Sequence, residues 1–372
     1  MRIIVSGGGT GGHIYPALTL IRAVQEKSPK AEFLYVGTRH GLEADIIPRE
    51  GISFQTVDIR GFERRFSFAN IGRAAAALAG VVKAIRIVRT FRPDAVIGTG
   101  GYVCGPTLLA ASLLGVPTLI QEQNVVPGLT NRILARFVTR VAVGPPEAAA
   151  YFPARKTVVT GNPIRREIML AKREDALATF GLDPGKKTVL VSGGSQGAHS
   201  INRAMIGVLA YYANHPEVQF LHATGSGEYE KILVKLQAEG VDLAAAKNLV
   251  IRPYLYNMPE AMACADLAVF RAGAIGIAEL TARGIPAVLV PYPYAAANHQ
   301  AHNARALAEA GAARMILDRD LTDEHLLGVL KELLSEEREL KRMAERSRAL
   351  GRPQAAEEIA ALALAMTEGR KQ

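Results

Sequence analysis

Short runs of apolar residues recur along the chain and alternate with longer segments that have helical spacing. In the first half, such runs predict strands at residues 3–5, 33–36, 95–97, 118–120 and 141–143. In the second half, they predict strands at residues 189–191, 219–223, 250–253, 267–270, 287–290 and 314–317. Between several of these lie helical patterns, such as residues 16–26. The alternation predicts an α/β fold of parallel sheets with helices on both faces.

The two halves open on similar glycine-rich turns. Residues 5–13 (VSGGGTGGH) align without a gap with residues 191–199 (VSGGSQGAH), and each segment follows an expected strand and precedes a helical pattern. The repeat predicts two Rossmann-like domains facing each other, at 1–162 and 163–350, joined where glycine and proline interrupt both periods at 161–163. A last helical segment, within 351–372, is expected to pack back on the first domain.

A glycine turn between a strand and a helix suits an anion, because backbone N–H groups and the helix N-terminus can approach it closely. The first turn fits the pattern G-x-G-x-x-G at Gly7, Gly9 and Gly12, but no acid follows the second strand until Glu43. The second turn breaks that pattern, and neither turn ends like a P-loop. We therefore expect phosphate or pyrophosphate binding without hydride transfer. The alternative is a turn that only allows tight packing.

Three polar clusters follow expected strands of the first half. His13 lies at the start of a helix, whose N-terminus favours the neutral imidazole that a general base requires. Glu122-Gln123-Asn124 follows one strand, and Thr99-Gly100-Gly101-Tyr102 follows the strand before it. These groups are suited to bind sugar hydroxyls or to activate an acceptor. The alternatives are a capping or packing histidine and a loop held by its own hydrogen bonds.

The second half has a comparable cluster. Residues 270–274 end a strand and Glu279 follows, as a carboxylate near a helix start that could accept both ribose hydroxyls. After the next strand come amide and imidazole groups that suit a neutral sugar, namely Asn298, His299, Gln300 and Asn303. Each of them alone would be an ordinary surface residue. Their position after successive strands favours a ligand site, because ligands of such sheets bind beyond the carboxyl ends of strands.

The net charge of +9 belongs entirely to the first half. Residues 1–162 hold 19 Lys and Arg against 10 Asp and Glu, and the remainder holds 25 of each. This asymmetry indicates an anionic partner: a nucleic acid, a phospholipid surface or a phosphorylated substrate. Between 60 and 92, basic residues flank a helical segment at 71–91 whose apolar stripe contains Ile71, Leu78, Val82 and Ile85. That pattern suits an anionic membrane surface. The alternative is a core helix with a basic edge.

Other features of the composition limit the cellular setting. The two cysteines, Cys104 and Cys264, form neither a disulfide framework nor a zinc site, which fits a reducing cytosol. The first residues lack the regions of a signal peptide, and no apolar run is long enough to cross a bilayer. We therefore expect a peripheral protein at the cytoplasmic face of a membrane, without a bound metal.

Seven motifs together resemble those of one bacterial enzyme family. They are GGTGGH (8–13), GTGGY (98–102), EQN with PGLTN (122–131), GNPIR (161–165), GGSQGA (193–198), RAGA with AEL (271–280) and HQ with NA (299–304). In this order they resemble the bacterial lipid I N-acetylglucosaminyltransferases. The resemblance implies a GT-B fold and an inverting, cofactor-free transfer of GlcNAc from UDP-GlcNAc to the MurNAc 4-hydroxyl of undecaprenyl-pyrophosphoryl-MurNAc-pentapeptide (lipid I). The product would be lipid II, the peptidoglycan precursor.

The resemblance also implies residue roles. His13 and Glu122 would face the acceptor hydroxyl, and which of them is the base stays open. UDP-GlcNAc would contact Thr10, Gly11, Gly12, Asn124, Arg165, Ser195, Gln196, Leu255, Ala274, Glu279, His299, Gln300 and Asn303. The acceptor and its pyrophosphate would contact Gly9, Thr99, Gly100, Gly101 and Tyr102. The membrane face would include Arg73, Leu78, Val82, Lys83, Ile85 and Arg86. His299 departs from a glutamine in other family members, which leaves its role open.

Three rival functions remain at this stage. Another UDP-sugar transferase or a UDP-sugar epimerase could share the fold. A nucleic-acid-binding protein could use the basic first half, although a recognition motif is missing and aromatic residues make up only 6% of the chain, so we expect no nucleic acid partner. A lipid-binding scaffold without catalysis would leave the sugar cluster of the second half unexplained.

Overall fold

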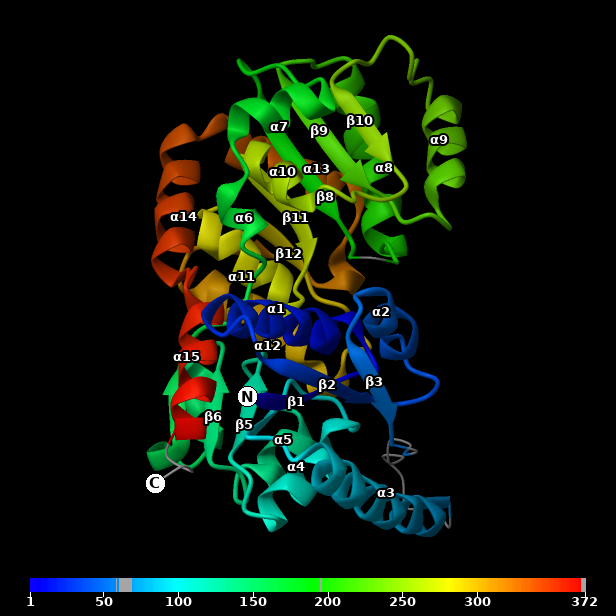
Figure 1. The fold of residues 1–372 in the computed structure, drawn as a ribbon. Coiled ribbons are helices and arrows are strands. Elements are labelled where there is room, and N and C mark those ends of the chain that lie inside the picture. Colours follow the sequence, from blue (N-terminus) through cyan, green and yellow to red (C-terminus); the bar gives the residue numbers. More distant parts are fainter. Residues whose placement is uncertain (58, 60–68, 195, 369–372) are drawn as a thin grey trace. The chain divides into compact units, whose positions relative to one another are not determined.

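The computed structural model describes residues 1–57, 59, 69–194 and 196–368, without the side chains of residues 69–77. The chain divides into two compact units, one of Met1–Ile164 with Pro353–Gln372 and one of Arg165–Arg352 (Figure 1). The division after Ile164 directly follows the expected linker at 161–163. The last helix therefore belongs to the first unit, although the whole second unit separates them in sequence.

The first unit is built on one parallel sheet with the strand order β3-β2-β1-β4-β5-β6-β7. Its elements are β1 (Arg2–Ser6), α1 (Gly11–Lys27), β2 (Glu32–Gly37), α2 (Glu43–Arg49), β3 (Ser53–Thr56), α3 (Ala69–Phe91), β4 (Ala95–Gly98), α4 (Cys104–Leu113), β5 (Thr118–Glu122), α5 (Leu129–Leu134), β6 (Arg140–Val143), β7 (Thr157–Val159) and α15 (Ala355–Glu368). The expected strands of this half are all present. Two edge strands, β3 and β7, were not predicted.

Alternation along β1 divides the first unit into two hydrophobic cores. Ile3 and Val5 pack with α1 and α15, whereas Ile4 packs with α3 and α4 on the opposite face of the sheet. This is the period-two pattern of a strand that is buried on both faces. α15 lies beside α1 (Figure 1), so the last helix of the chain packs in the same hydrophobic core as the first strand.

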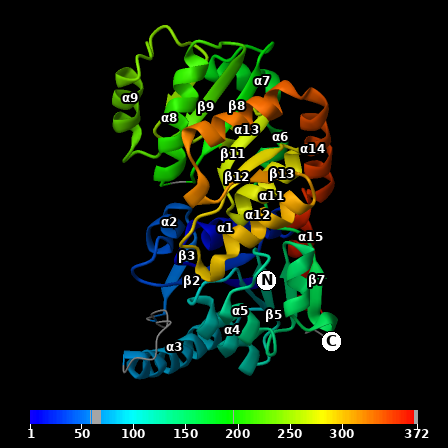
Figure 2. The same ribbon diagram turned by 180° about the vertical axis from the view of Figure 1, so that it is seen from behind.

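The second unit repeats the plan with a parallel sheet of strand order β10-β9-β8-β11-β12-β13. Its elements are α6 (Glu167–Leu170), α7 (Arg173–Phe180), β8 (Lys187–Ser192), α8 (His199–Ala213), β9 (Val218–Ala223), α9 (Tyr229–Ala238), β10 (Leu249–Arg252), α10 (Met258–Cys264), β11 (Leu267–Arg271), α11 (Ala274–Arg283), β12 (Ala287–Val290), α12 (His299–Glu309), β13 (Ala313–Met315), α13 (Asp323–Ser335) and α14 (Glu337–Leu350). The strands expected in this half are all present. Helices α8 and α13 pack together over one face of this sheet (Figure 2).

Both strand orders reverse direction at one point, and this determines where a ligand can bind. In the first sheet β1 lies between β2 and β4, and in the second β8 lies between β9 and β11. The loops that follow β1 and β4 therefore diverge to opposite faces of the sheet, as do those that follow β8 and β11, and the crevice between such loops is the usual ligand site. The two glycine turns follow β1 and β8, the first strand of each pair.

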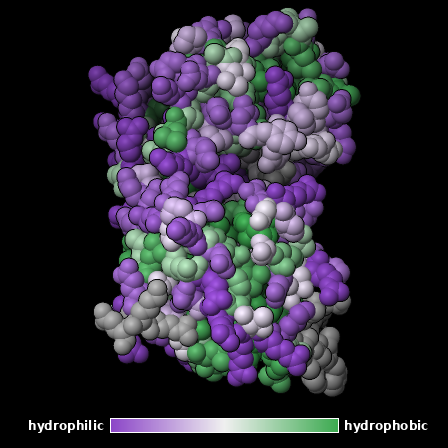
Figure 3. All heavy atoms as spheres, viewed as in Figure 1, coloured by the Kyte–Doolittle hydropathy of each residue, from purple (hydrophilic) through white to green (hydrophobic). Residues whose placement is uncertain are grey.

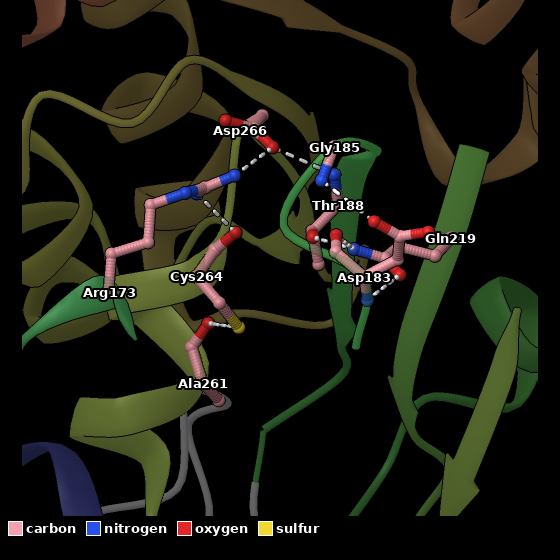
Figure 4. A network of polar contacts seen from close by, with 8 residues as sticks. All are labelled: Arg173, Asp183, Gly185, Thr188, Gln219, Ala261, Cys264 and Asp266. Carbon is pink, nitrogen blue, oxygen red and sulfur yellow. Dashed lines mark hydrogen bonds and ion pairs between the residues drawn. The ribbon is translucent and has the colours of Figure 1, made fainter. Parts of the chain in front are cut away.

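The opposite end of the second sheet is held by a polar network (Figure 4). Asp266 accepts hydrogen bonds from the backbone N–H of Thr188, at 2.8 Å, and from the Arg173 guanidinium, at 2.9 Å. The Gln219 amide donates to the Asp183 carbonyl, at 2.8 Å, and to the Thr188 hydroxyl, at 2.9 Å. These bonds fix the starts of β8, β9 and β11 relative to one another, and they lie away from the glycine turn.

We expect Asp266→Ala to destabilise the protein. It leaves the N–H of Thr188 buried without its acceptor, which costs about 1–3 kcal/mol. Glu332→Ala is the matched control, because Glu332 pairs with Arg314 at the surface, where an ion pair is worth at most about 1 kcal/mol. Equilibrium urea unfolding measures both, and equal midpoints for the two variants would refute the role given to Asp266.

Candidate active site

Two side chains, those of Tyr35 and Glu43, fix the first glycine turn. The Tyr35 hydroxyl donates to the Gly7 carbonyl at 2.8 Å. The buried Glu43 carboxylate accepts hydrogen bonds from the Gly9 N–H, at 3.1 Å, and from the N–H and hydroxyl of Thr38. The N–H of Gly9 is thus directed at Glu43. Donors for an anion must come from the following residues, Thr10, Gly11 and Gly12, where α1 begins and its first N–H groups have no partner within the helix.

The second loop of this unit fits against the first because it lacks side chains. Gly100 and Gly101 have φ angles of +105° and +78°, which few other residues adopt. A Cβ at Gly101 would overlap the Gly8 carbonyl, and one at Gly100 would lie 2.8 Å from the His13 ring. The Thr99 hydroxyl donates to the His13 carbonyl at 2.8 Å, and Tyr102 is 41% exposed at the end of the loop.

His13 lies in the first turn of α1, as the sequence predicts. Its Nδ1 lies 3.0 Å from the Thr99 carbonyl oxygen and 3.0 Å from Oε1 of Gln123. Both neighbours belong to loops that follow strands at or next to the switch point. The fold therefore brings the first glycine turn, the 99–102 loop and the 122–124 segment to one place in the first unit.

Glu122 has a different environment from the one expected of a base. The residue is 1% exposed. One carboxylate oxygen accepts hydrogen bonds from the N–H and the side chain of Asn124, and the other from the Gly128 N–H and the Asn131 amide. Glu122 would have to give up one of these bonds to take a proton. Its contacts are those of a residue that organises the 122–131 loop.

Cys104 lies beneath the 99–102 loop but is not suited to covalent catalysis. It is fully buried, and its thiol points at the Gly101 carbonyl, 3.1 Å away. Burial raises the pKa of the thiol to about 12, so the nucleophilic thiolate is scarce at neutral pH.

In the second unit, Arg165 and Glu279 form an ion pair although they are 114 residues apart. Nε and Nη2 of Arg165 both lie 3.0 Å from Oε1 of Glu279. Glu279 lies in the middle of α11, not near its start as expected, and is 5% exposed. Burial raises the pKa of its carboxyl, and the charge of Arg165 opposes this rise.

The second glycine turn packs against the end of β9. A Cβ at Gly197, where φ is +76°, would overlap the Thr224 carbonyl, and one at Gly225 would lie 2.5 Å from the Gln196 carbonyl. Gln196 is exposed in this turn. Ser195 lies outside the described residues.

The remaining residues expected to contact UDP-GlcNAc lie in a loop or in the helix that follows a strand. Leu255 is buried after β10, and Ala274 opens α11. The Gln300 side chain accepts from the Tyr292 N–H at 2.9 Å, and the Asn303 amide donates to the Ala272 carbonyl at 3.3 Å. Nδ1 of His299 lies 2.8 Å from the Ala296 carbonyl. Asn303 thus joins α12 to the turn in front of α11.

The sequence did not assign a role to several residues that shape these loops. Glu43 and Tyr35 fix the first turn. In the second unit Arg271 bonds the carboxylate of Asp318, the Ser200 hydroxyl at 2.7 Å and the carbonyls of Val290 and Pro291, each at 3.2 Å. The position of Arg271 at a strand end, inside a motif of the family, could have indicated this role. The sequence does not show its partners, which lie far away along the chain. Within the described residues, no group of three His, Cys, Asp or Glu side chains could hold a metal ion.

Two doubly wound units, each with a glycine turn at its switch point, define a nucleotide-binding protein of the Rossmann-like class. Residues 3–143 match the model of the glycosyltransferase family 28 N-terminal domain, and residues 188–359 match that of its C-terminal domain. The chain therefore belongs to glycosyltransferase family 28.

Individual relatives agree with this assignment. A protein of Desulforamulus reducens named UDP-N-acetylglucosamine--N-acetylmuramyl-(pentapeptide) pyrophosphoryl-undecaprenol N-acetylglucosamine transferase is 49% identical and covers 96% of this chain and 97% of its own. The crystal structure of Acinetobacter baumannii MurG superposes with a TM-score of 0.77 at 29% identity, covering 98% of this chain and 99% of its own. The expected GT-B fold is confirmed.

The fold alone does not separate the chemistries. A Neisseria meningitidis UDP-GlcNAc 2-epimerase, whose structure holds UDP-GlcNAc, has a TM-score of 0.69 at 14% identity, over 98% of this chain and all of its own. At that identity the likeness concerns the fold only, and the family rests on the sequence match.

We expect Arg165→Met to lower the free energy of unfolding by about 1–3 kcal/mol at neutral pH, because the buried Glu279 loses a charged hydrogen-bond partner. Without Arg165 the pKa of Glu279 rises further, so acidification protonates the carboxyl and relieves the cost. The deficit relative to the wild type should therefore be largest at neutral pH and shrink as pH falls. Urea unfolding at several pH values measures it. A deficit that grows on acidification would contradict the buried pair.

Proposed function

We propose that this protein transfers GlcNAc from UDP-GlcNAc to the MurNAc 4-hydroxyl of undecaprenyl-pyrophosphoryl-MurNAc-pentapeptide, which is lipid I, and so produces lipid II for peptidoglycan. The proposal rests on one observation: 49% identity, over 96% of the chain, to a relative with the name of that transferase. The residues gathered at the switch points supply the groups that this reaction needs.

The second unit is the donor domain in this proposal. Glu279 would accept hydrogen bonds from the ribose hydroxyls through Oε2, since Arg165 contacts Oε1. Arg165 and the backbone at Leu255 would hold uracil. The second glycine turn, with Ser195 and Gln196, would bind the diphosphate, with Ala274 at the start of α11 beside it. His299, Gln300 and Asn303 would contact the sugar.

The first unit is the acceptor domain. The start of α1, at Thr10, Gly11 and Gly12, offers backbone N–H groups and the positive end of a helix dipole to a phosphate or a developing charge. The N–H of Gly9 already donates to Glu43 and is not available to a ligand. Gly9 would instead let the acceptor lie close to the backbone, because it has no side chain. Thr99, Gly100, Gly101 and Tyr102 would contact the acceptor and its pyrophosphate.

The chemistry is a direct displacement with His13 as the general base. The MurNAc 4-oxygen forms a bond to the anomeric carbon while the bond from that carbon to the diphosphate oxygen breaks, so the configuration inverts. The hydroxyl proton passes to the imidazole, and UDP departs with the bonding electrons. We assign the base to His13 because the oxygens of Glu122 already accept hydrogen bonds from their own loop.

The direct test is transfer of labelled GlcNAc from UDP-GlcNAc to a short-chain lipid I analogue. We expect a disaccharide product with inverted linkage, formed only when the analogue is present. Conversion of UDP-GlcNAc to its C2 epimer in the absence of an acceptor would instead favour the epimerase function and contradict the proposal.

We expect His13→Ala to lower turnover by about 100- to 10,000-fold, the usual contribution of a general base. Affinity for UDP-GlcNAc should change little, because the donor is held mainly by the second unit. Steady-state transfer rates and calorimetric titration of UDP-GlcNAc measure the two effects. His325→Ala, at an exposed histidine of α13, is the control and should match the wild type. Near-normal turnover of His13→Ala would exclude His13 as the base.

We also propose that α3 binds the cytoplasmic surface of an anionic membrane, where the lipid acceptor resides. Leu78 is 68% exposed and Val82 is 48% exposed, and the exposed Arg86 follows one turn later, with the half-exposed Lys83 between them. Hydrophobic side chains reach the surface at this edge of the first unit (Figure 3). Ile85 packs partly against the core and contributes less than expected, and the side chain of Arg73 lies outside the described residues. No described helix has the length and hydropathy to span a bilayer.

The double variant Leu78→Ser with Val82→Ser should bind anionic vesicles more weakly and keep its turnover of a soluble short-chain acceptor. Leu170→Ser with Val234→Ser is the matched control, since these residues of the second unit are 62% and 63% exposed. Vesicle co-sedimentation compares the pairs. Equal binding of both double variants and the wild type would exclude α3 as the membrane contact.

A further inference from the structure

His13 is connected to a chain of buried side-chain amides that the proposed reaction does not use. Oε1 of Gln123 lies 3.0 Å from Nδ1 of His13, and Nε2 of Gln123 donates to Oε1 of Gln121. Nε2 of Gln121 donates in turn to Oδ1 of Asn162 at 3.0 Å. The Asn162 amide closes the chain by donating to the Gln123 carbonyl at 2.9 Å.

The direction of this chain follows from the atoms around Gln123. Its Nε2 faces three oxygens, namely the Thr99 carbonyl at 2.6 Å, the Gln121 carbonyl at 3.1 Å and the Gln121 side-chain oxygen. Turning the amide over would place its oxygen against all three. Nitrogen must therefore occupy that position, and Oε1 must face His13.

This orientation leaves one role for the histidine nitrogen. Nδ1 lies between two oxygens that can only accept, the Thr99 carbonyl and Oε1 of Gln123. A neutral imidazole carries one N–H, and it must lie on Nδ1 to satisfy these acceptors. The lone pair then lies on Nε2.

We propose that Gln123 is a positioning residue that, with Thr99, holds His13 in the Nδ1–H tautomer, so that Nε2 is the atom that accepts the proton of the acceptor hydroxyl. Gln121 and Asn162 support Gln123 in this role. The three amides are at most 8% exposed, so water competes little for their hydrogen bonds. Asn162 belongs to the 161–163 segment directly before the second unit, so the chain of amides runs from the interdomain linker to the base.

The first test reads the tautomer without turnover. In protein labelled with ¹⁵N-histidine, the resonances of His13 are assigned by their loss in His13→Gln. At a pH where the ring is neutral we expect the shift of a protonated nitrogen at Nδ1 and that of an unprotonated nitrogen at Nε2. The reverse pattern would overturn the inference.

Two substitutions test Gln123 itself. Gln123→Met removes one of the two acceptors at Nδ1, so the Nε2–H form should become detectable and kcat should fall by about tenfold or more with KM for UDP-GlcNAc unchanged. Gln123→Glu places a second oxygen against the Thr99 and Gln121 carbonyls, so its carboxyl should carry a proton there, donate one hydrogen bond and keep an acceptor at Nδ1. The Nδ1–H form should then persist, with kcat closer to that of the wild type than in Gln123→Met. An unchanged tautomer and kcat in the first variant, or loss of the Nδ1–H form in the second, would refute the role.

Gln219→Met is the matched control, because Gln219 is a buried glutamine of the second unit with a comparable set of hydrogen bonds. It should lower stability and leave the His13 resonances unchanged. The inference rests on His13 being the base, but the two can fail separately. Normal turnover of His13→Ala would refute the assignment of His13 as the base. If His13→Ala is inactive but the wild-type ring carries its proton on Nε2, only the role proposed for Gln123 is refuted.

Discussion

The position of His13 depends on how closely two loops of the first unit can approach each other. The loop after β4 meets the turn after β1 at Gly101 and Gly8, and any Cβ on Gly101 would overlap the carbonyl of Gly8. Thr99, two residues earlier, therefore lies near enough to bond both the carbonyl and the ring of His13. Parallel strands bring these loops together at the switch point, and glycine removes the atoms that would keep them apart.

Buried carboxylates hold the surrounding loops in place. Glu43 accepts hydrogen bonds from Gly9 and Thr38, and Glu122 accepts from Asn124, Gly128 and Asn131. An ionised group removed from water is tolerated only when such donors replace its hydration. Because each carboxylate binds backbone N–H groups, it fixes the path of the chain as well as its own position. Rigid loops of this kind keep catalytic groups oriented before the substrates arrive.

The sequence predicts the sheets better than it predicts the contacts between loops. Strands such as β1 and β8 are recognisable because they are buried on both faces and read as uninterrupted apolar runs. The two missed strands, β3 and β7, are edge strands with partly exposed residues, Ser53–Thr56 and Thr157–Val159, and a sheet neighbour on only one side. Their pairing depends on a neighbour already in position, which local pattern does not encode.

Site residues divide in the same way. The glycine turns and His13 follow from a short motif, because strand, turn and helix are adjacent in the chain. The pairing of Arg165 with Glu279, and of Gly9 with Glu43, joins residues separated by 114 and 34 positions, and only the fold determines it. The sequence also does not tell the roles of Glu122 and Gln123 apart, because neighbouring side chains on a loop point in different directions. The hydrogen-bond donors around each side chain separate them: four donors surround the Glu122 carboxylate, whereas one oxygen of Gln123 reaches the imidazole. In the proposed mechanism, the tautomer of His13 is set by buried amides. The motifs contain Gln123 and Asn162, but the direction of their hydrogen bonds requires the structure.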